Sequence, residues 1–132
     1  DLSFPWGMAC LPDGRLIITE KEKGILRIAK TNGELSKPIT GLPKVFASGQ
    51  GGLLGIAVDP SFEQNRMLYW TFSEAVEGGS VTSVAKGKLS ADETKIEGAN
   101  VIYRATPAFK NDLHYSGCIL FDKSGHLMVS SG

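Results

Sequence analysis

A layout that recurs three times along the 132 residues most strongly constrains how this chain can fold. In each copy a small residue precedes a short apolar segment, an Asp-containing turn follows, and a second apolar segment comes next. The Asp residues are Asp13, Asp59 and Asp122, with uneven separations near fifty residues. Repeats of roughly 40–50 residues, each forming a four-stranded sheet, are typical of β-propeller blades. The repeat therefore predicts a propeller, and about two and a half blades of that size fit in residues 1–132.

The segments between turn signals are short and rich in Val, Ile, Tyr, Phe and Thr, which indicates β-strands. Hairpins are predicted at Asp13-Gly14 and Asn32-Gly33. Ser90–Glu93 matches a helix capping box, but no apolar stripe follows it, so we expect a turn between outer strands there. The chain is predicted to be all-β, with a β-sandwich as the competing architecture. Besides the first apolar segments of the first two repeats, strands are expected at Arg15–Glu20, Ile25–Lys30, Met67–Phe72, Val81–Leu89, Val101–Arg104, Gly117–Phe121 and Leu127–Ser130.

Several side chains are assigned to the core rather than to a site. Cys10 and Cys118 lie in apolar runs and are expected to be buried thiols rather than a disulfide. Within the segment Tyr69–Phe72, strand alternation places Trp70 and Phe72 on one face and their neighbours on the other. The aromatic residues expected to contribute mainly to the core are Trp6, Tyr69, Trp70 and Phe72.

The composition excludes several classes of function. Fourteen Lys and Arg balance fourteen Asp and Glu, so the chain has no basic excess for binding nucleic acid. The longest uncharged apolar stretches, such as Gly51–Val58, are far shorter than the ~20 residues that span a bilayer. The acidic residues are scattered and lack the Asp-x-Asp-x-Asp spacing of a calcium loop. We therefore expect neither nucleic-acid binding nor membrane insertion, and we assign no metal ligand in this chain.

The two ends suggest a chain interrupted within its fold. It begins at Asp1 rather than Met, and it stops at Gly132 directly after an apolar run. Propellers typically close with four to eight blades, and an open set would leave sheet edges exposed. The ring is thus expected to be completed by the remainder of a longer propeller or by a homo-oligomer of this chain.

Two polar residues occupy equivalent places just before the first strand of their repeats: Gln50 precedes Asp59, and His114 precedes Asp122. In a propeller the first strand borders the central channel, so its start lies at one mouth of the channel, a common position for ligand sites. We therefore expect Gln50 and His114 to face one cavity. An imidazole with an ordinary pKa of about 6.5 accepts protons near neutral pH, and a carboxamide offers donors and an acceptor to a polar ligand. The alternative is that His114 is a surface or structural histidine, as we expect for His126.

The glycine-rich run Gly49–Gly55 accompanies Gln50. No Lys-Ser/Thr pair and no helical pattern follows it, which argues against a phosphate-binding loop. Glycines before an inner strand are better explained by close approach of the backbone to a ligand or a neighbouring blade.

Taken together, the motifs resemble one known family. Phe4–Ala9 and Leu11–Leu16 are similar to the opening of the glucose/sorbosone dehydrogenases, which include soluble quinoprotein glucose dehydrogenase and the aldose sugar dehydrogenases. The resemblance extends in the same order over essentially the whole chain, so that residues 1–132 would form the N-terminal part of such a domain. It continues through Gly41-Leu42-Pro43, Gly49–Gly55, Asp59–Phe62 and His114–Gly117.

This resemblance implies a six-bladed propeller that binds pyrroloquinoline quinone (PQQ), usually with calcium, and oxidises aldoses at C1 to lactones. It implies a periplasmic or secreted location. His114 matches the family's catalytic base, which takes the C1 hydroxyl proton while hydride passes to the quinone, and Gln50 matches a glutamine that lines the same site. Leu113 replaces an aspartate that some members place before the histidine. The family's quinone-holding residues and calcium ligands lie beyond Gly132, so residues 1–132 alone are expected to bind no cofactor and to be inactive.

The sequence alone leaves open two alternatives from other classes of protein. The chain could be a non-catalytic propeller module that binds sugars or proteins, or a propeller fragment that closes its ring by self-assembly.

Overall fold

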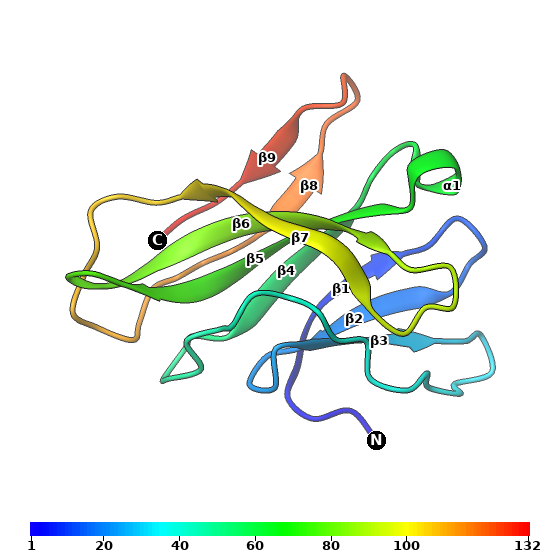
Figure 1. Cartoon of the computed structure of the whole chain (residues 1–132), viewed down its shortest axis with the longest axis horizontal. Coiled ribbons are helices and arrows are strands. Elements are labelled where there is room, and N and C mark those ends of the chain that lie inside the picture. Colours follow the sequence, from blue (N-terminus) through cyan, green and yellow to red (C-terminus); the bar gives the residue numbers. More distant parts are fainter.

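The computed structural model describes all 132 residues, and its regular secondary structure is almost entirely strand, as Figure 1 shows. A single short helix, α1, follows the first strand of the second repeat. No helix in the structure has the length and hydropathy that a membrane crossing requires. In chain order the elements are β1 (Pro5–Cys10), β2 (Leu16–Glu20), β3 (Ile25–Ala29), β4 (Leu53–Val58), α1 (Phe62–Asn65), β5 (Met67–Val76), β6 (Gly79–Leu89), β7 (Ile96–Arg104), β8 (Ile119–Phe121) and β9 (Leu127–Val129).

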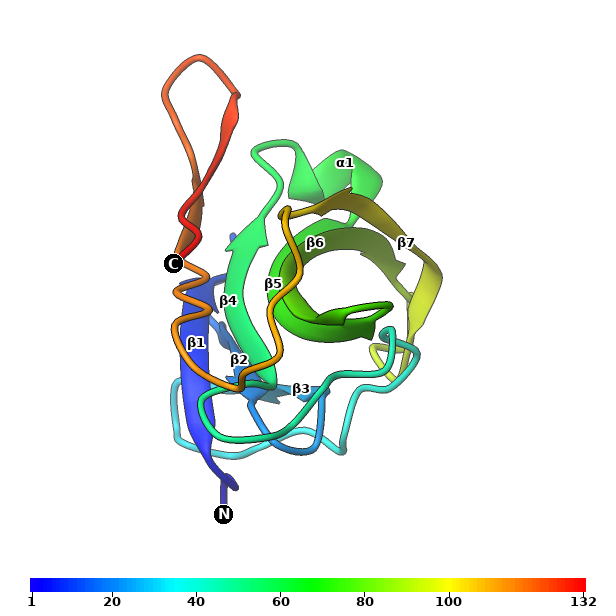
Figure 2. The same ribbon diagram turned by 90° about the vertical axis from the view of Figure 1, so that its left-hand side faces the viewer.

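The strands form three separate antiparallel sheets that follow one another along the chain. The orders are β1-β2-β3, β4-β5-β6-β7 and β8-β9, so each sheet is a meander of sequence neighbours. The first strands of successive sheets contact each other, β1 with β4 and β4 with β8. Figure 2 shows β1 and β4 side by side at one edge of the molecule, with the outer strands β6 and β7 away from that edge. This is the arrangement of consecutive propeller blades and not that of a sandwich.

All the segments predicted to be strands form strands, with modest differences in their bounds. The hairpin at Asp13-Gly14 joins β1 to β2, and Ser90–Glu93 is a turn between β6 and β7, as predicted. After the Asn32-Gly33 turn the chain pairs with β3 only through two isolated bridges, Ala29 with Leu35 and Leu26 with Ile39. Between these bridges the ladder is interrupted, since the Ser36 hydroxyl and not a backbone carbonyl accepts the Ile28 N–H at 2.9 Å.

The core lies between the first and second sheets and continues, more thinly, between the second and third. Trp70 and Phe72 are fully buried in the first of these layers, as predicted. Tyr69 points to the opposite face and packs edge-on against Phe121, with ring centroids 5.1 Å apart. The larger layer consists of Leu11, Ile17, Leu26, Ile28, Ile39, Leu53, Ile56, Phe62, Leu68, Trp70, Phe72, Ala85, Leu89 and Ile96.

Three predictions about buried side chains are wrong. Trp6 is 57% exposed, and Cys10 and Cys118 are exposed, although both cysteines are free thiols as expected. The side chains of a strand point alternately to its two faces. Trp6, Met8 and Cys10 lie on the face of β1 that does not pack on the core. Exposed and buried residues also alternate just before β8, and Cys118 occupies one of the exposed positions.

A buried threonine hydroxyl joins the first sheet to the second. Thr19 Oγ1 accepts the Gly7 N–H at 2.7 Å and donates to the Leu54 carbonyl at 2.8 Å. A Cβ on Gly7 would lie 2.5 Å from that carbonyl oxygen, so only glycine allows this approach of β1 to β4.

The second sheet joins the third in the same way. Thr71 Oγ1 accepts the Gly55 N–H at 2.9 Å and donates to the Gly117 carbonyl at 2.6 Å. A Cβ on Gly55 would lie 2.3 Å from the Gly117 carbonyl oxygen. Gly7 within β1 and Gly55 within β4 therefore allow close approach between neighbouring sheets. The hydroxyl of Thr71 thus holds the segment just before β8, three residues after His114.

Charged side chains connect the sheets at the opposite end. Glu93, in the β6–β7 turn, forms a bidentate ion pair with Arg15, whose two Nη atoms lie 2.6 and 2.7 Å from its carboxylate oxygens. Arg66 Nη2 lies farther from the same carboxylate, at 3.3 Å. The hydrogen bonds from Arg15 hold the pKa of the Glu93 carboxyl below its usual range. Arg15 belongs to the β1–β2 turn region, so this pair anchors the second sheet to the first far from the loops before β4 and β8.

Candidate functional site

The loops that precede β4 and β8 meet at one end of the molecule. Gln50 Oε1 accepts the backbone N–H of His114 at 2.8 Å, although the two residues are 64 positions apart. Both side chains are exposed and line one cavity of about 520 Å³. The structure thus brings together the two residues that the repeat alignment placed at a shared rim. The cavity is lined by Trp6, Gln50, Leu54, His114, Tyr115, Ser116 and Gly132.

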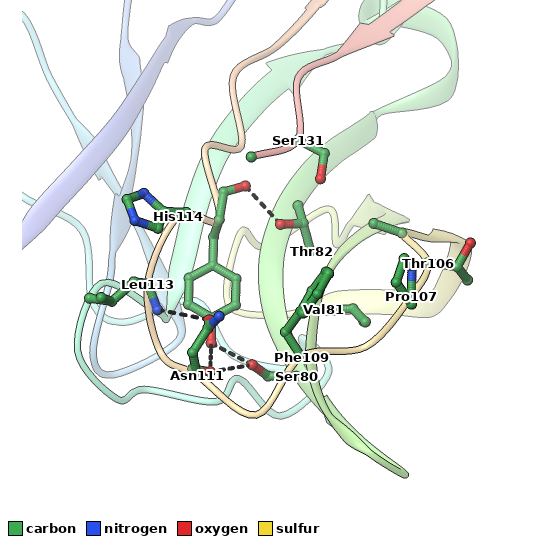
Figure 3. A pocket seen from close by; sticks show the side chains of 13 residues that line it. Ser80, Val81, Thr82, Thr106, Pro107, Phe109, Asn111, Leu113, His114 and Ser131 are labelled. Atoms are coloured by element: carbon green, nitrogen blue, oxygen red, sulfur yellow. Dashed lines mark hydrogen bonds between the residues drawn. The ribbon is translucent and has the colours of Figure 1, made fainter.

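Tyr115 anchors the histidine loop to the second sheet. Its side chain is 5% exposed, and its hydroxyl lies 2.6 Å from Ser80 Oγ on β6. Its carbonyl oxygen accepts the Thr82 hydroxyl at 2.7 Å (Figure 3). Residues 114–119 alternate between exposed and buried, so the burial of Tyr115 turns His114 and Ser116 outward. His114 also lines a second cavity of about 240 Å³, together with Thr106 and Pro107, which lie on the other side of it in Figure 3.

The backbone of this loop has an uncommon conformation. His114 has φ 61° and Ser116 has φ 58°, both in the left-handed region that residues other than glycine rarely occupy. Such conformations persist where the surroundings determine them, and they cluster at functional sites. Here the surroundings are the Gln50 acceptor and the buried Tyr115 between the two residues. The imidazole is therefore held at the rim by its own backbone rather than by side-chain packing.

Trp6, which was predicted to lie in the core, instead contributes an aromatic face to the cavity. The Lys21 ammonium lies 5.6 Å from the centre of the Trp6 ring and donates to the Gly49 carbonyl at 3.2 Å. The sequence contains one signal for Trp6, which directly follows Pro5. Pro5 occupies the place before Asp13 that Gln50 occupies before Asp59 and His114 before Asp122. Tyr115 was also missed, since nothing in its own sequence position distinguishes an anchor from an ordinary core aromatic.

The site offers acid–base and hydrogen-bonding groups rather than a metal centre. Gln50 Oε1 is used by the His114 N–H, which leaves the amide Nε2 with two donors for a ligand. The His114 ring supplies a proton acceptor. No group of three or more His, Cys, Asp or Glu side chains lies close enough together to hold a metal ion. His126 lies in the β8–β9 turn, 3.1 Å from Asp122, and takes no part in this cavity.

Successive blades with an imidazole and a carboxamide at one end define a propeller with a cavity that is partly polar and partly aromatic. The sequence model of the glucose / sorbosone dehydrogenase family matches residues 2–132, and the chain belongs to this family. The fold predicted from the repeats is confirmed by a solved glucose dehydrogenase structure, which matches with a TM-score of 0.93 and 41% identity over 99% of this chain and 38% of that one.

Two curated relatives show how far the similarity reaches. Aldose sugar dehydrogenase YliI of Escherichia coli (strain K12) is 35% identical over 132 residues, which are 99% of this chain and 36% of that protein. Quinoprotein glucose dehydrogenase B of Acinetobacter calcoaceticus is 35% identical over 72 residues, covering 52% of this chain and 15% of that protein. The chain thus spans little more than a third of the length of YliI.

Proposed function

We propose that the full-length gene product is a PQQ-dependent sugar dehydrogenase that oxidises aldoses at C1 to lactones. Residues 1–132 would contribute one wall of its active site. The observation that carries the proposal is the hydrogen bond from His114 to Gln50, which places both residues in one cavity. Membership of the glucose / sorbosone dehydrogenase family and the names of its relatives support this reaction class.

In this proposal His114 is the general base and Gln50 a ligand contact. The His114 imidazole takes the proton of the C1 hydroxyl, and the C1–O bond becomes the lactone carbonyl. Gln50 Nε2 donates to a sugar or cofactor oxygen, because its Oε1 is already engaged by the His114 N–H. Tyr115 holds the loop, so that the base stays at the rim while the sugar is exchanged.

The residues present are compatible with a planar, anionic quinone. The Trp6 ring offers a flat apolar face, Lys21 a nearby positive charge, and Gln50 two amide donors. When bound, the quinone supplies the two-electron oxidant that accepts the C1 hydride. Calcium belongs to the proposal only through the resemblance, since no ligand cluster for a metal ion occurs in this chain. We expect that residues 1–132 alone bind neither group tightly and are inactive, because Trp6, Lys21 and Gln50 form only part of a pocket.

The location and assembly are likewise proposed. The resemblance favours a periplasmic or secreted enzyme. The exposed apolar residues Met8 on β1 and Met128 on β9 lie on strands of the first and last sheets. They favour completion of the ring, either by further blades of the same protein or by a homo-oligomer.

The test is aldose oxidation by the full-length gene product, reconstituted with PQQ and calcium and coupled to a reducible dye. We expect dye reduction that requires both the quinone and an aldose such as glucose. 1,5-Anhydroglucitol is the matched control, because it has the same ring without a C1 hydroxyl, and it should give no reduction. Aldose binding without any quinone-dependent oxidation would contradict the proposal and favour the alternative of a non-catalytic sugar-binding propeller.

A further inference from the structure

The side chain of Asp112 lies outside the 520 Å³ cavity but holds together the two loops that form it. Its carboxylate Oδ2 accepts the Ser48 hydroxyl at 3.0 Å. Its backbone carbonyl accepts the N–H of Gln50 at 2.8 Å. Asp112 is not among the residues that line the cavity containing Gln50 and His114.

The loop before β4 is shaped to fit Asp112. Gly49, between the two bonded residues, has φ +53°, and a Cβ there would lie 2.5 Å from the Asp112 carboxyl carbon and 2.7 Å from its carbonyl oxygen. Only glycine combines this conformation with such an approach. The contact is therefore a close fit of backbone on side chain, and not a loose surface hydrogen bond.

The bonds close a ring that contains both candidate site residues. Asp112 accepts from the backbone of Gln50, and the side chain of Gln50 accepts from the backbone of His114, two positions after Asp112. The direction of the Gln50 side chain thus depends on a backbone that Asp112 holds. Asp112 is also the only acidic residue in 105–117, and Leu113, beside His114, carries no polar side-chain group.

We propose that Asp112 is a positioning residue, whose carboxylate clamps the Ser48–Gln50 loop so that Gln50 and His114 keep their relative placement. It touches neither sugar nor cofactor and acts through those two residues. This inference rests on the proposed function for its catalytic consequence, but the clamp itself is a property of the two loops. Displacements of about 1 Å at a catalytic group can lower rates by up to 10²-fold, so loss of the clamp has a measurable cost.

The experiment compares four variants of the full-length gene product: Asp112→Ala, Asp112→Asn, Ser48→Ala and the double variant Ser48→Ala/Asp112→Ala. Asp112→Ala and Ser48→Ala each remove the clamp, and we expect each to lower kcat by about 10-fold to 10²-fold. The double variant should lose no more than Asp112→Ala alone, because both changes break one bond. Asp112→Asn keeps an oxygen acceptor for the Ser48 hydroxyl and should retain most of the activity.

Hydrogen–deuterium exchange provides a readout that does not require activity. In Asp112→Ala and Ser48→Ala, exchange should accelerate at the Gln50 and His114 amides, whose acceptors belong to the ring, and remain unchanged in β6. Asp92→Asn is the matched control: Asp92 accepts the Ser90 hydroxyl at 2.7 Å in the β6–β7 turn, at the far end of the sheet. It should change neither exchange at the site nor kcat.

The outcomes separate the two proposals. Unchanged exchange at the Gln50 and His114 amides in both alanine variants would overturn the clamp. Faster exchange with wild-type kcat would overturn the positioning role, as would additive losses in the double variant. If the wild-type protein oxidised no aldose, the proposed function would fail, and the exchange data would still decide whether Asp112 clamps the loops. Ser48→Ala removes the same hydrogen bond from its other partner and keeps the test valid if Asp112→Ala does not fold.

Discussion

Replacing His114 with asparagine in the full-length protein is expected to lower kcat for aldose oxidation by about 10²–10⁴, the usual contribution of a positioned general base. Asparagine is the most informative substitute because His114 has φ 61°, and asparagine tolerates the left-handed region better than most residues. Its side chain can still form hydrogen bonds but cannot take up a proton at neutral pH. The loss would therefore report the chemistry of the imidazole and not a change of backbone conformation.

The measurement is steady-state kinetics with saturating quinone and a dye acceptor, together with the melting temperature of each variant. His126→Asn is the matched control, because His126 is an exposed turn residue paired with Asp122 outside the cavity. We expect the control to keep wild-type kcat. A His114→Asn protein that folds, binds the quinone and turns over at the wild-type rate would remove His114 from the mechanism.

The second large effect is on stability. Thr71→Val keeps the shape of a fully buried side chain but removes the hydroxyl that bridges two sheets. The Gly55 N–H and the Gly117 carbonyl would then lack partners. Each buried polar group left unpaired costs about 1–3 kcal/mol, so we expect the free energy of unfolding to fall by about 2–4 kcal/mol. Gly117 lies between the histidine loop and β8, and activity should therefore decline at temperatures where the wild type is stable.

Denaturation of the full-length protein in urea measures this loss. Thr71→Ser is the matched control, because it keeps the hydroxyl bridge and removes only a methyl group; we expect it to cost about 1 kcal/mol. A Thr71→Val protein as stable as Thr71→Ser would show that the bridge between Gly55 and Gly117 contributes little to the packing of the blades.

The fold was predictable from sequence because its determinants are local. Asp-containing turns and short apolar segments mark each hairpin, and their recurrence indicates repeated sheets rather than a sandwich. The alternation in Tyr69–Phe72 correctly separated the two core layers. The exposure of Cys10 and Cys118 was not predictable, because hydrophobicity alone does not say which face of an inner strand is covered by a neighbouring sheet.

The candidate site was predictable only in outline. Aligning the repeats placed Gln50 and His114 at equivalent positions, and the sheet geometry brought their loops into contact. The residues that hold them there were missed, since Tyr115 and Asp112 act through contacts with segments distant in sequence. Such contacts depend on how neighbouring blades stack, which no motif within a single blade encodes.

The most direct test of the account is the position of a bound aldose in a crystal structure of the full-length protein with its quinone. We predict that the sugar occupies the cavity lined by Trp6, Gln50 and His114, with its C1 hydroxyl within hydrogen-bond distance, about 2.6–3.2 Å, of the His114 ring. A sugar bound at another face of the propeller, with its C1 hydroxyl out of reach of His114, would contradict the account.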